Sequence, residues 1–173
     1  VRQTNDLSRI VDEFSKFARM PEPEKQSEDI IKVVNAAISL QESGFPEIVF
    51  KRNIIEGPIM FELDATMISQ AFINLLKNAG ESIESRQDKD GSSEVKGQID
   101  IIVERHDTFL EVAVIDNGIG LPADRARLFE PYVTTRENGT GLGLAIVKKI
   151  IEEHGGTFRL EDAPKYKNSC LLY

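Results

Sequence analysis

Tryptophan is absent from this chain of 173 residues, and only one cysteine and two histidines are present. The single cysteine, Cys170, cannot form a disulfide within the chain, which suits a reducing cytosol. Long hydrophobic runs are absent too, since no stretch approaches the ~18 consecutive apolar residues that cross a membrane. The opening VRQTNDLSRI lacks the apolar core of a signal peptide and starts without Met. We therefore expect a cytoplasmic piece of a longer protein, with no membrane contact of its own.

Positive charge is in short supply, because 21 Lys and Arg face 29 Asp and Glu, for a net charge of −8. Nucleic-acid binding requires a basic face, so we expect no nucleic-acid partner. Binding of an anionic small ligand is still compatible with this net charge, because helix dipoles, local lysines or a metal ion can override it near a site. A hydrophobic fraction of 40% with 29% charged residues is typical of a globular domain with one sizeable core.

An amphipathic helix is predicted over residues 1–19, where apolar residues recur at spacings of three and four. The segment MPEPEKQ, residues 20–26, ends this helix because its two prolines do not continue helical backbone. Two arrangements remain open: the helix packs on the following domain, or it protrudes into a helix bundle, which its heptad-like spacing favours. We expect residues 1–20 to belong to such a bundle, 21–26 to be a linker and 27–173 to be a compact domain. The apolar positions are Leu7, Ile10, Val11, Phe14 and Phe17.

Helices of the compact domain are predicted from capping residues and apolar stripes. Ser27 is expected to cap a helix that reaches about residue 41, with Glu28 and Asp29 in its first turn. Asp64 is expected to cap the helix that contains FINLLKNAGES, and a polar loop is expected at residues 86–98. A third helix is indicated by LGLAIVKKIIEEHGG, which ends at two glycines.

Strands of the compact domain are predicted from short runs of β-branched and aromatic residues. Two of these runs, residues 99–105 and 109–115, read as a hairpin. Helices and strands alternate irregularly, which indicates an α+β sandwich of one sheet under helices. The other predicted strands are residues 47–54, 59–63, 157–161 and 169–173.

Two asparagines, Asn74 and Asn78, stand one turn apart within FINLLKNAGES. At ~100° per residue they lie about 40° apart beside Glu81, on the flank of an apolar stripe. Asparagine is a mediocre helix former and is costly to bury without partners. Amide oxygens at this edge either bond to nearby backbone or ligate a hard cation such as Mg²⁺. The stripe comprises Ile68, Ala71, Phe72, Leu75 and Ala79.

The segment VIDNGIGLP places a carboxylate, Asp116, at the end of an apolar strand, followed by Gly118 and Gly120. A carboxylate in that position can accept a hydrogen bond from a ligand donor such as an exocyclic amine. The two glycines allow the backbone to approach a flat ring closely. The alternative is an ordinary turn at a strand end, since Asp-Asn-Gly is common in turns.

The segment ENGTGLGLAIVKK leads three glycines, Gly139, Gly141 and Gly143, directly into a helix. Free backbone N–H groups and the positive helix end then point the same way, which is typical of phosphate binding. The spacing fits neither a Walker A loop nor the dinucleotide fingerprint. A flexible linker before a helix is the alternative.

In this order the motifs resemble those of the catalytic, ATP-binding domain of sensor histidine kinases, within the superfamily that includes gyrase, Hsp90 and MutL. NLLKNAGE is similar to the N box, DNGIG to the G1 box, LFEPYVTTR to the F box and GTGLGLAIVKKIIEEHGG to the G2 box. The leading IVDEFSKFARMPEP resembles the end of the second dimerisation helix in NtrY-type nitrogen-regulation kinases. The resemblance, over roughly residues 27–162, implies a Bergerat-type ATP-binding fold, a two-layer α+β sandwich of a mixed, mostly antiparallel sheet under helices.

The same resemblance implies a site for ATP and Mg²⁺. Asn78 is expected to hold Mg²⁺ between the phosphates, with Asn74 supporting it. Asp116 is expected to bind the adenine amine in a purine pocket shaped by Gly118 and Gly120, and the F box and following residues to form a mobile lid. The other expected nucleotide-binding residues are Lys77, Thr134, Thr135, Arg136, Gly139, Thr140, Gly141, Leu142 and Gly143, with Phe129 and Tyr132 packing the lid.

The superfamily divides by chemistry at the position of Asn74. Its hydrolases have a glutamate there, which activates water as a general base. An amide cannot accept that proton, so hydrolysis is expected to be slow and the γ-phosphoryl group is kept for transfer to a histidine. The alternatives are a GHKL-type ATPase, which would need the glutamate, an anti-sigma serine kinase, which normally lacks the leading helix, and a scaffold, which would show eroded motifs.

The acceptor histidine of the family lies upstream of these motifs, so we expect no catalytic residue within the chain. His106 in a hairpin turn and His154 at a helix end, where a cation favourably meets the dipole, are expected to be structural. The resemblance implies a response regulator as partner, a homodimer through the dimerisation helices, and a parent protein anchored in the inner membrane. EDAPKYKNSCLLY departs from the family's usual glycine-rich turn, so the pairing of the last strand stays open.

Overall fold

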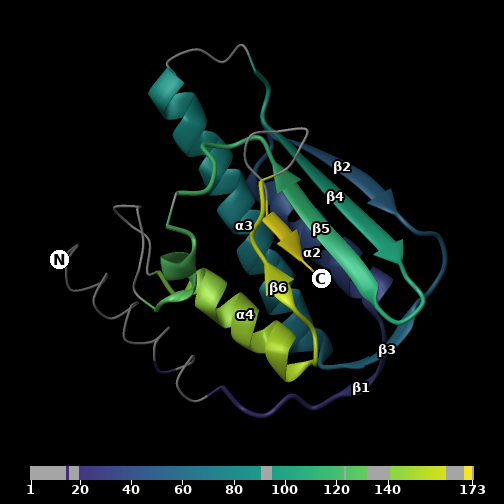
Figure 1. The fold of residues 1–173 in the computed structure, drawn as a ribbon. Coiled ribbons are helices and arrows are strands. Elements are labelled where there is room, and N and C mark those ends of the chain that lie inside the picture. Colours follow the sequence, from purple (N-terminus) through teal and green to yellow (C-terminus); the bar gives the residue numbers. More distant parts are fainter. Residues whose placement is uncertain are drawn as a thin grey trace.

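The computed structural model describes residue 15 and residues 20–90, 95–122, 124–131, 141–162 and 170–172. Helices cover one face of a five-stranded sheet (Figure 1). The strand order is β2-β4-β5-β7-β6, with β2 and β4 parallel and the other neighbours antiparallel. The predicted mixed, mostly antiparallel sheet under helices is therefore confirmed. The strands are β2 (Val49–Ile54), β4 (Gln98–Arg105), β5 (Leu110–Asp116), β6 (Phe158–Arg159) and β7 (Cys170–Leu172).

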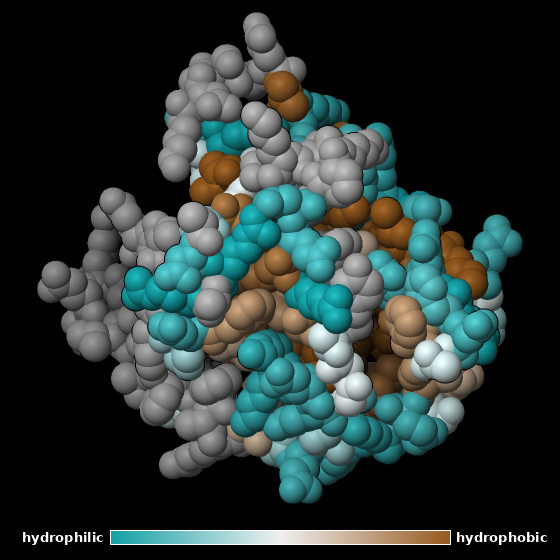
Figure 2. Space-filling view, in the orientation of Figure 1, coloured by the Kyte–Doolittle hydropathy of each residue, from teal (hydrophilic) through white to brown (hydrophobic). Residues whose placement is uncertain are grey.

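The core lies between the sheet and the three helices α2 (Ile30–Gly44), α3 (Ala65–Asp90) and α4 (Gly143–Glu153). Alternate residues of β4 face the helices, and Ile99, Ile101 and Val103 are at most 2% exposed. Burying an aliphatic side chain of this size is worth about 1.5–3 kcal/mol, so this contact stabilises both layers. Some hydrophobic surface remains visible, bordered by hydrophilic side chains, on the face drawn in Figure 2. The helical core residues include Val34, Ile38, Leu76, Ile83, Val147 and Ile150.

The hairpin of β4 and β5 forms as predicted, in a register that pairs Ile99 with Asp116. Side chains directly opposite each other lie on the same face of an antiparallel pair, so Asp116 points to the helix side, as Ile99 does. At the other end of the hairpin, the N–H of His106 donates to the carbonyl of Phe109 at 2.9 Å. The imidazole of His106 stacks on the Phe109 ring and pairs with Glu111, which gives this histidine a structural role.

Asp64 caps α3 as predicted, because its Oδ1 accepts hydrogen bonds from the N–H groups of Thr66 and Met67, both at 3.0 Å. The helix then continues to Asp90, so the prediction of a loop beginning at residue 86 is wrong. Residues 86–90, RQDKD, carry no apolar stripe and therefore looked like a loop. Arginine, glutamine and lysine are nevertheless good helix formers, and they extend a helix that the core has already nucleated.

Ser27 does not cap α2, which corrects the second capping prediction. Residues 26–29 form a strand, β1 (Gln26–Asp29), antiparallel to β3 (Met60–Leu63) in a separate two-stranded sheet. Asp29 is the N-cap instead, and its Oδ1 accepts from the N–H groups of Ile31 and Ile59. The acidic residues predicted for the first turn of the helix therefore lie before it, since pairing with a distant strand outweighs the local capping signal.

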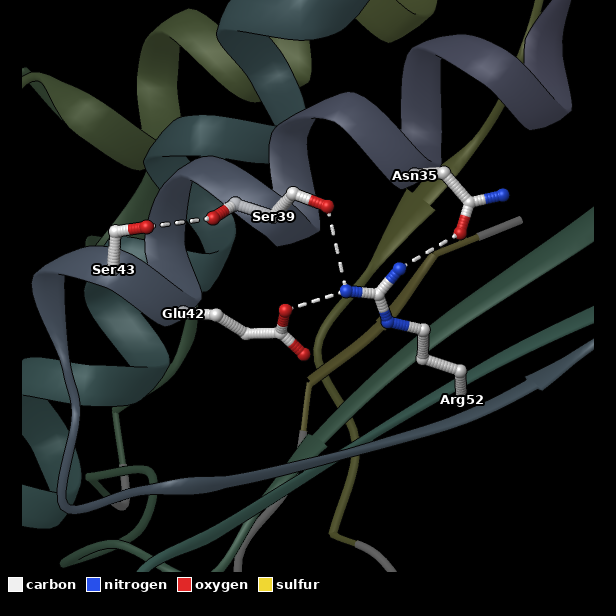
Figure 3. A network of polar contacts seen from close by, with 5 residues as sticks. All are labelled: Asn35, Ser39, Glu42, Ser43 and Arg52. Carbon is white, nitrogen blue, oxygen red and sulfur yellow. Dashed lines mark hydrogen bonds and ion pairs between the residues drawn. The ribbon is translucent and has the colours of Figure 1, made fainter.

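Arg52 fastens the edge strand β2 to α2, as Figure 3 shows. Its guanidinium donates to the side chains of Asn35, Ser39 and Glu42, which lie along one face of the helix. Arg52 pairs with Ile101 in the ladder, so it lies on the helix-facing side of the strand. An inward-pointing charge on an edge strand opposes pairing with a second sheet, so the contact both orients α2 and protects the edge.

The pairing of the last strand is now settled, because β7 lies between β5 and β6 and pairs antiparallel with both. At the other end of the chain, Met20 packs against the core and the N–H of Glu24 donates to Asp64 Oδ2 at 3.1 Å. The predicted leading helix falls on residues 1–14 and 16–19, which lie outside the described residues. Within the described part of the chain, no helix is both long enough and apolar enough to cross a membrane.

Candidate nucleotide site

The two asparagines of α3 lie where the sequence predicts, on the flank of the buried stripe. The five stripe residues are between 1% and 4% exposed, whereas Asn74 and Asn78 are half-buried. The side-chain amides therefore stand at the border between core and solvent. This position is suited to amide oxygens that ligate a cation without losing all contact with water.

The glycine-rich segment reaches α3 at Asn78. An ideal Cβ on Gly143, the first residue of α4, would lie 3.5 Å from Nδ2 and 3.9 Å from Oδ1 of Asn78. Gly141 has a φ of 69°, a left-handed conformation that residues with side chains rarely adopt. Glycine at residue 141 therefore allows this turn to form, and the start of α4 lies against the carboxamide of Asn78.

Leu142 anchors the turn, because its side chain is fully buried while its carbonyl accepts the N–H of Ile146 at 2.9 Å. The predicted contact of Leu142 with a nucleotide stays a prediction. Leu142 is also the N-cap of α4, and its apolar side chain makes no capping hydrogen bond. A helix start of this kind directs backbone N–H groups outward and is suited to binding phosphate.

Asp116 and the loop after it meet the next turn of the same helix. The carboxylate is 6% exposed, and its Oδ1 accepts a hydrogen bond from the N–H of Gly118 at 2.9 Å. A Cβ on Gly118 would lie 2.0 Å from the hydroxyl oxygen of Ser82 and 2.7 Å from Asp116 Oδ1. Only glycine fits in this space. The loop backbone is therefore pressed against α3, beside the buried carboxylate.

The segments of the N, G1 and G2 boxes thus converge on one face of α3. Gly143 lies at Asn78, and Gly118 lies at Ser82, one helical turn later. Residues four apart in a helix share a face, so both glycine segments approach α3 from the same side. None of the three motifs alone distinguished a ligand site from ordinary local structure, but their meeting point is a single location.

Asn117 secures the loop to the sheet. Its Oδ1 accepts from the N–H of Gln98 and its Nδ2 donates to the carbonyl of Lys96, both at 2.9 Å. The N–H of Asn117 also donates to the carbonyl of Gln98. Gly120, with a φ of 91°, then turns the chain. Figure 1 shows the chain leaving β5 and running across α3 toward α4.

Lys77 is exposed, and its ammonium lies 3.8 Å from Glu81 one turn further along α3. Its contact with a nucleotide stays a prediction. The short helix η1 (Ala126–Phe129) reaches into the F box and packs on α4, where the Lys148 ammonium lies over the Phe129 ring. The Phe129 ring also meets Phe158 of β6 edge to face. Tyr132, Thr134, Thr135, Arg136, Gly139 and Thr140 lie outside the described residues.

His154 is structural, but it is not the helix-end cation that the sequence suggests. Its Nδ1 lies 2.7 Å from the carbonyl of Ile150 and must donate, because a carbonyl only accepts. Its Nε2 accepts the N–H of Asp64 at 3.0 Å. The imidazole is therefore neutral and joins the end of α4 to the start of α3. The sequence motifs predicted neither this contact nor the contact of Ser82 with Gly118, since each depends on a partner far away in the chain.

Two hollows lie at the opposite end of α3 from this convergence. One of about 780 Å³ is lined by Asp64, Thr66 and Met67 among others, and one of about 610 Å³ is lined by Phe109 and His154 among others. None of the described residues of the predicted nucleotide site lines either hollow. Among the residues that the structure describes, no three His, Cys, Asp or Glu side chains gather as metal ligands. A divalent ion at Asn78 would therefore depend on amide oxygen, water and ligand phosphates, a donor set that suits Mg²⁺.

Comparison with known proteins identifies relatives for most of the chain. Residues 63–171 match the family described as histidine kinase-, DNA gyrase B- and HSP90-like ATPases. The chain is 48% identical to the nitrogen regulation protein NtrY of Azorhizobium caulinodans over 99% of its own length and 22% of that protein. It is 35% identical to the sensory histidine kinase/phosphatase NtrB of Rhodobacter capsulatus, over 95% of this chain and 48% of that protein. The chain therefore spans about a fifth and about half of these two relatives.

Solved structures of histidine kinases are also similar to this chain. The histidine kinase ThkA in complex with the response regulator protein TrrA is similar with a TM-score of 0.74 and 29% identity, over 98% of this chain and 47% of that one. Full-length ShkA in complex with AMPPNP is similar in fold, with a TM-score of 0.78 and 23% identity over 99% of this chain and 36% of that one. The two layers described above are thus a fold that histidine kinases have.

Proposed function

Because the chain belongs to the family of histidine kinase-, DNA gyrase B- and HSP90-like ATPases, we propose that it is the ATP-binding catalytic domain of a sensor histidine kinase in nitrogen regulation. The observation that carries the proposal is the convergence of the three motif segments on one face of α3. A nucleotide held there would have its base beside Asp116 and its phosphates beside Gly143. The catalytic activity belongs to the longer protein, in which this domain supplies the phosphoryl donor.

At the phosphate end, Asn78 would hold Mg²⁺ through its amide oxygen, with Asn74 one turn earlier supporting it. The bound ion would supply charge neutralisation between the phosphates. The close approach of Gly143 to Asn78 supports this assignment, since a side chain at residue 143 would occupy the space in front of the amide. The backbone N–H groups from Gly141 to Gly143 would bind phosphate oxygens at the start of α4.

At the base end, the Asp116 carboxylate would accept a hydrogen bond from the exocyclic amine of adenine. Its position supports this role, because the carboxylate stands at the end of β5, beside the loop that is packed on α3. The N–H of Gly118 already fixes one carboxylate oxygen. The carboxylate plane is therefore set before a base arrives, which favours a single orientation of the purine.

The choice of an amide at residue 74 supports phosphoryl transfer over hydrolysis. A carboxylate in that place would take a proton from water as a general base, and an amide does not. In the proposed reaction the γ-phosphoryl group leaves the bridging oxygen of ATP and bonds to a ring nitrogen of a histidine on the longer protein. ADP is the other product. Neither His106 nor His154 is placed to be that acceptor, since both are engaged far from Asn78.

The partners follow from the same proposal. The phosphoryl group would pass from the histidine to an aspartate of a response regulator, and the solved complex of ThkA with TrrA supports this class of partner. Residues 1–20 would contribute to a dimerisation bundle that makes the longer protein a homodimer, with 21–26 as the linker and 27–173 as the catalytic domain. We further propose that this domain works in the cytoplasm and that the longer protein is anchored in the inner membrane.

Calorimetry with ATP, with and without Mg²⁺, tests the proposal directly. The unchanged chain is expected to bind ATP, and Asp116→Asn is expected to weaken binding, because an amide offers an N–H₂ group to the adenine amine. Asp107→Asn is the matched control, since that residue is exposed in the turn of the hairpin, at the other end of β5. Unchanged affinity in Asp116→Asn would overturn the assignment of the base site. Lack of ATP binding by the unchanged chain would overturn the function itself.

A further inference from the structure

Ser82 contacts the loop after β5, although no sequence motif points to it. Its carbonyl and its hydroxyl oxygen both accept from the N–H of Ile119, at 3.3 Å and 3.2 Å. A Cβ added to Gly118 would lie only 2.0 Å from the same hydroxyl oxygen. The loop backbone is therefore both packed on Ser82 and hydrogen-bonded to it.

This contact differs from the ordinary behaviour of serine in a helix. A serine hydroxyl in mid-helix usually bonds back to the carbonyl four residues earlier. Ser85, one turn further along α3, does this, because its hydroxyl donates to the carbonyl of Glu81 at 2.8 Å. The hydroxyl of Ser82 instead accepts from a residue 37 positions away. Ser85 is thus a matched control in the same helix.

The orientation of the Asp116 carboxylate depends on the backbone that Ser82 holds. Asp116 Oδ1 accepts the N–H of Gly118, and the next N–H, that of Ile119, is bound to Ser82. A movement of the Gly118–Ile119 backbone would therefore change the direction of the carboxylate. Asn117 restrains the same loop from the sheet side, so Ser82 supplies the restraint from the helix side.

We propose that Ser82 is a positioning residue for nucleobase recognition, whose hydroxyl holds the Gly118–Ile119 backbone so that the Asp116 carboxylate meets the exocyclic amine of adenine. The inference rests on the proposed function of the site and extends it to a residue that touches neither base nor phosphate. It also connects the two ends of the site, since Asn78 lies one turn before Ser82 in α3.

The test compares two nucleotides that differ at the amine. ADP carries the exocyclic amine and inosine 5′-diphosphate has a carbonyl in its place, so only ADP can donate a hydrogen bond from that position to Asp116. Removing one hydrogen bond from the loop is expected to weaken ADP binding about three- to tenfold. Ser82→Ala is therefore expected to reduce ADP affinity by that factor in calorimetry and to leave inosine diphosphate affinity unchanged. Ser85→Ala is expected to alter neither affinity, and Ser82→Thr, which retains a hydroxyl, is expected to keep the preference for ADP.

Several outcomes would overturn the inference. An equal loss for both nucleotides in Ser82→Ala would assign the residue a structural role only, and no loss would remove the role altogether. If Asp116→Asn lowers the preference for ADP and Ser82→Ala does not, the positioning role fails while the proposed function stands. If the unchanged chain binds neither nucleotide, the proposed function itself fails.

Amide hydrogen exchange of the unchanged chain tests the same contact without a variant, which keeps the inference testable if Ser82→Ala does not fold. The Ile119 N–H of the unchanged chain is expected to exchange with solvent much more slowly than an unstructured amide, because two oxygens of Ser82 accept from it. Exchange at the rate of an unstructured loop would contradict the contact on which the inference depends.

Discussion

Replacing Gly118 by alanine is expected to damage both the fold and the nucleotide site. The added Cβ would lie 2.0 Å from Ser82 Oγ, 2.7 Å from the Ser82 carbonyl carbon and 2.7 Å from Asp116 Oδ1. The serine hydroxyl can rotate away, but the backbone carbon of α3 cannot move without moving the helix. The loop must therefore shift away from α3 and take the carboxylate with it.

The size of the effect follows from overpacking. Forcing a methyl group into filled space in a protein typically costs about 1–3 kcal/mol. For a domain of this size, each kcal/mol lowers the melting temperature by about 2–4 °C, so the expected fall is about 2–12 °C. Urea unfolding followed by circular dichroism measures the same free energy independently. ADP affinity is expected to fall in the folded variant as well, because the Asp116 carboxylate is displaced.

Gly44→Ala is the matched control, because nothing lies within 4 Å of a Cβ at Gly44 and the residue is the last of α2. Alanine is the better helix former by about 1 kcal/mol, so this variant is expected to be as stable as the unchanged chain or more so. The reasoning would be refuted if Gly118→Ala proved as stable as Gly44→Ala, since the loop would then not be packed on the helix.

Three further changes test other parts of the structure. Gly80→Ala is expected to cost about 1–3 kcal/mol of stability, because its Cβ would lie 2.5 Å from the Phe45 ring. In a double-mutant cycle, adding Phe45→Leu to the same chain should restore part of that loss, since it removes the ring. Asp64→Ala is expected to cost about 1–2 kcal/mol in urea unfolding through loss of the α3 cap, and Asp64→Asn clearly less; equal losses would contradict the capping role. Asn74→Glu is expected to raise ATP hydrolysis, measured as phosphate release, since a general base typically contributes about 10²–10⁴-fold, and an unchanged rate would count against phosphoryl retention at this position.

Local signals sufficed for the parts of the fold in which pattern and pairing agree. The β4–β5 hairpin has apolar residues on alternate positions of both strands, so its existence and its inward face follow from sequence. The flank position of Asn74 and Asn78 follows from helical periodicity, and the Asp64 cap from its place before the stripe. These features need no knowledge of a distant partner.

The errors arose where a distant partner decides the local structure. Ser27 has the right chemistry for a cap, but it pairs with Glu62 in the β1–β3 ladder, so Asp29 takes that role. His154 has the right position for a helix-end cation, but the N–H of Asp64 makes it a neutral acceptor. The roles of Ser82 and Gly118 likewise depend on contact between segments far apart in the chain.

The magnesium dependence of ATP binding tests the central claim, that Asn78 and the glycine turn at the start of α4 hold the phosphates and their metal ion together. Calorimetry of the unchanged chain is expected to show tighter ATP binding with Mg²⁺ than without it. In Asn78→Ala this gain should disappear, while the weaker binding without Mg²⁺ persists through the base site at Asp116. A full magnesium-dependent gain in Asn78→Ala would contradict the account.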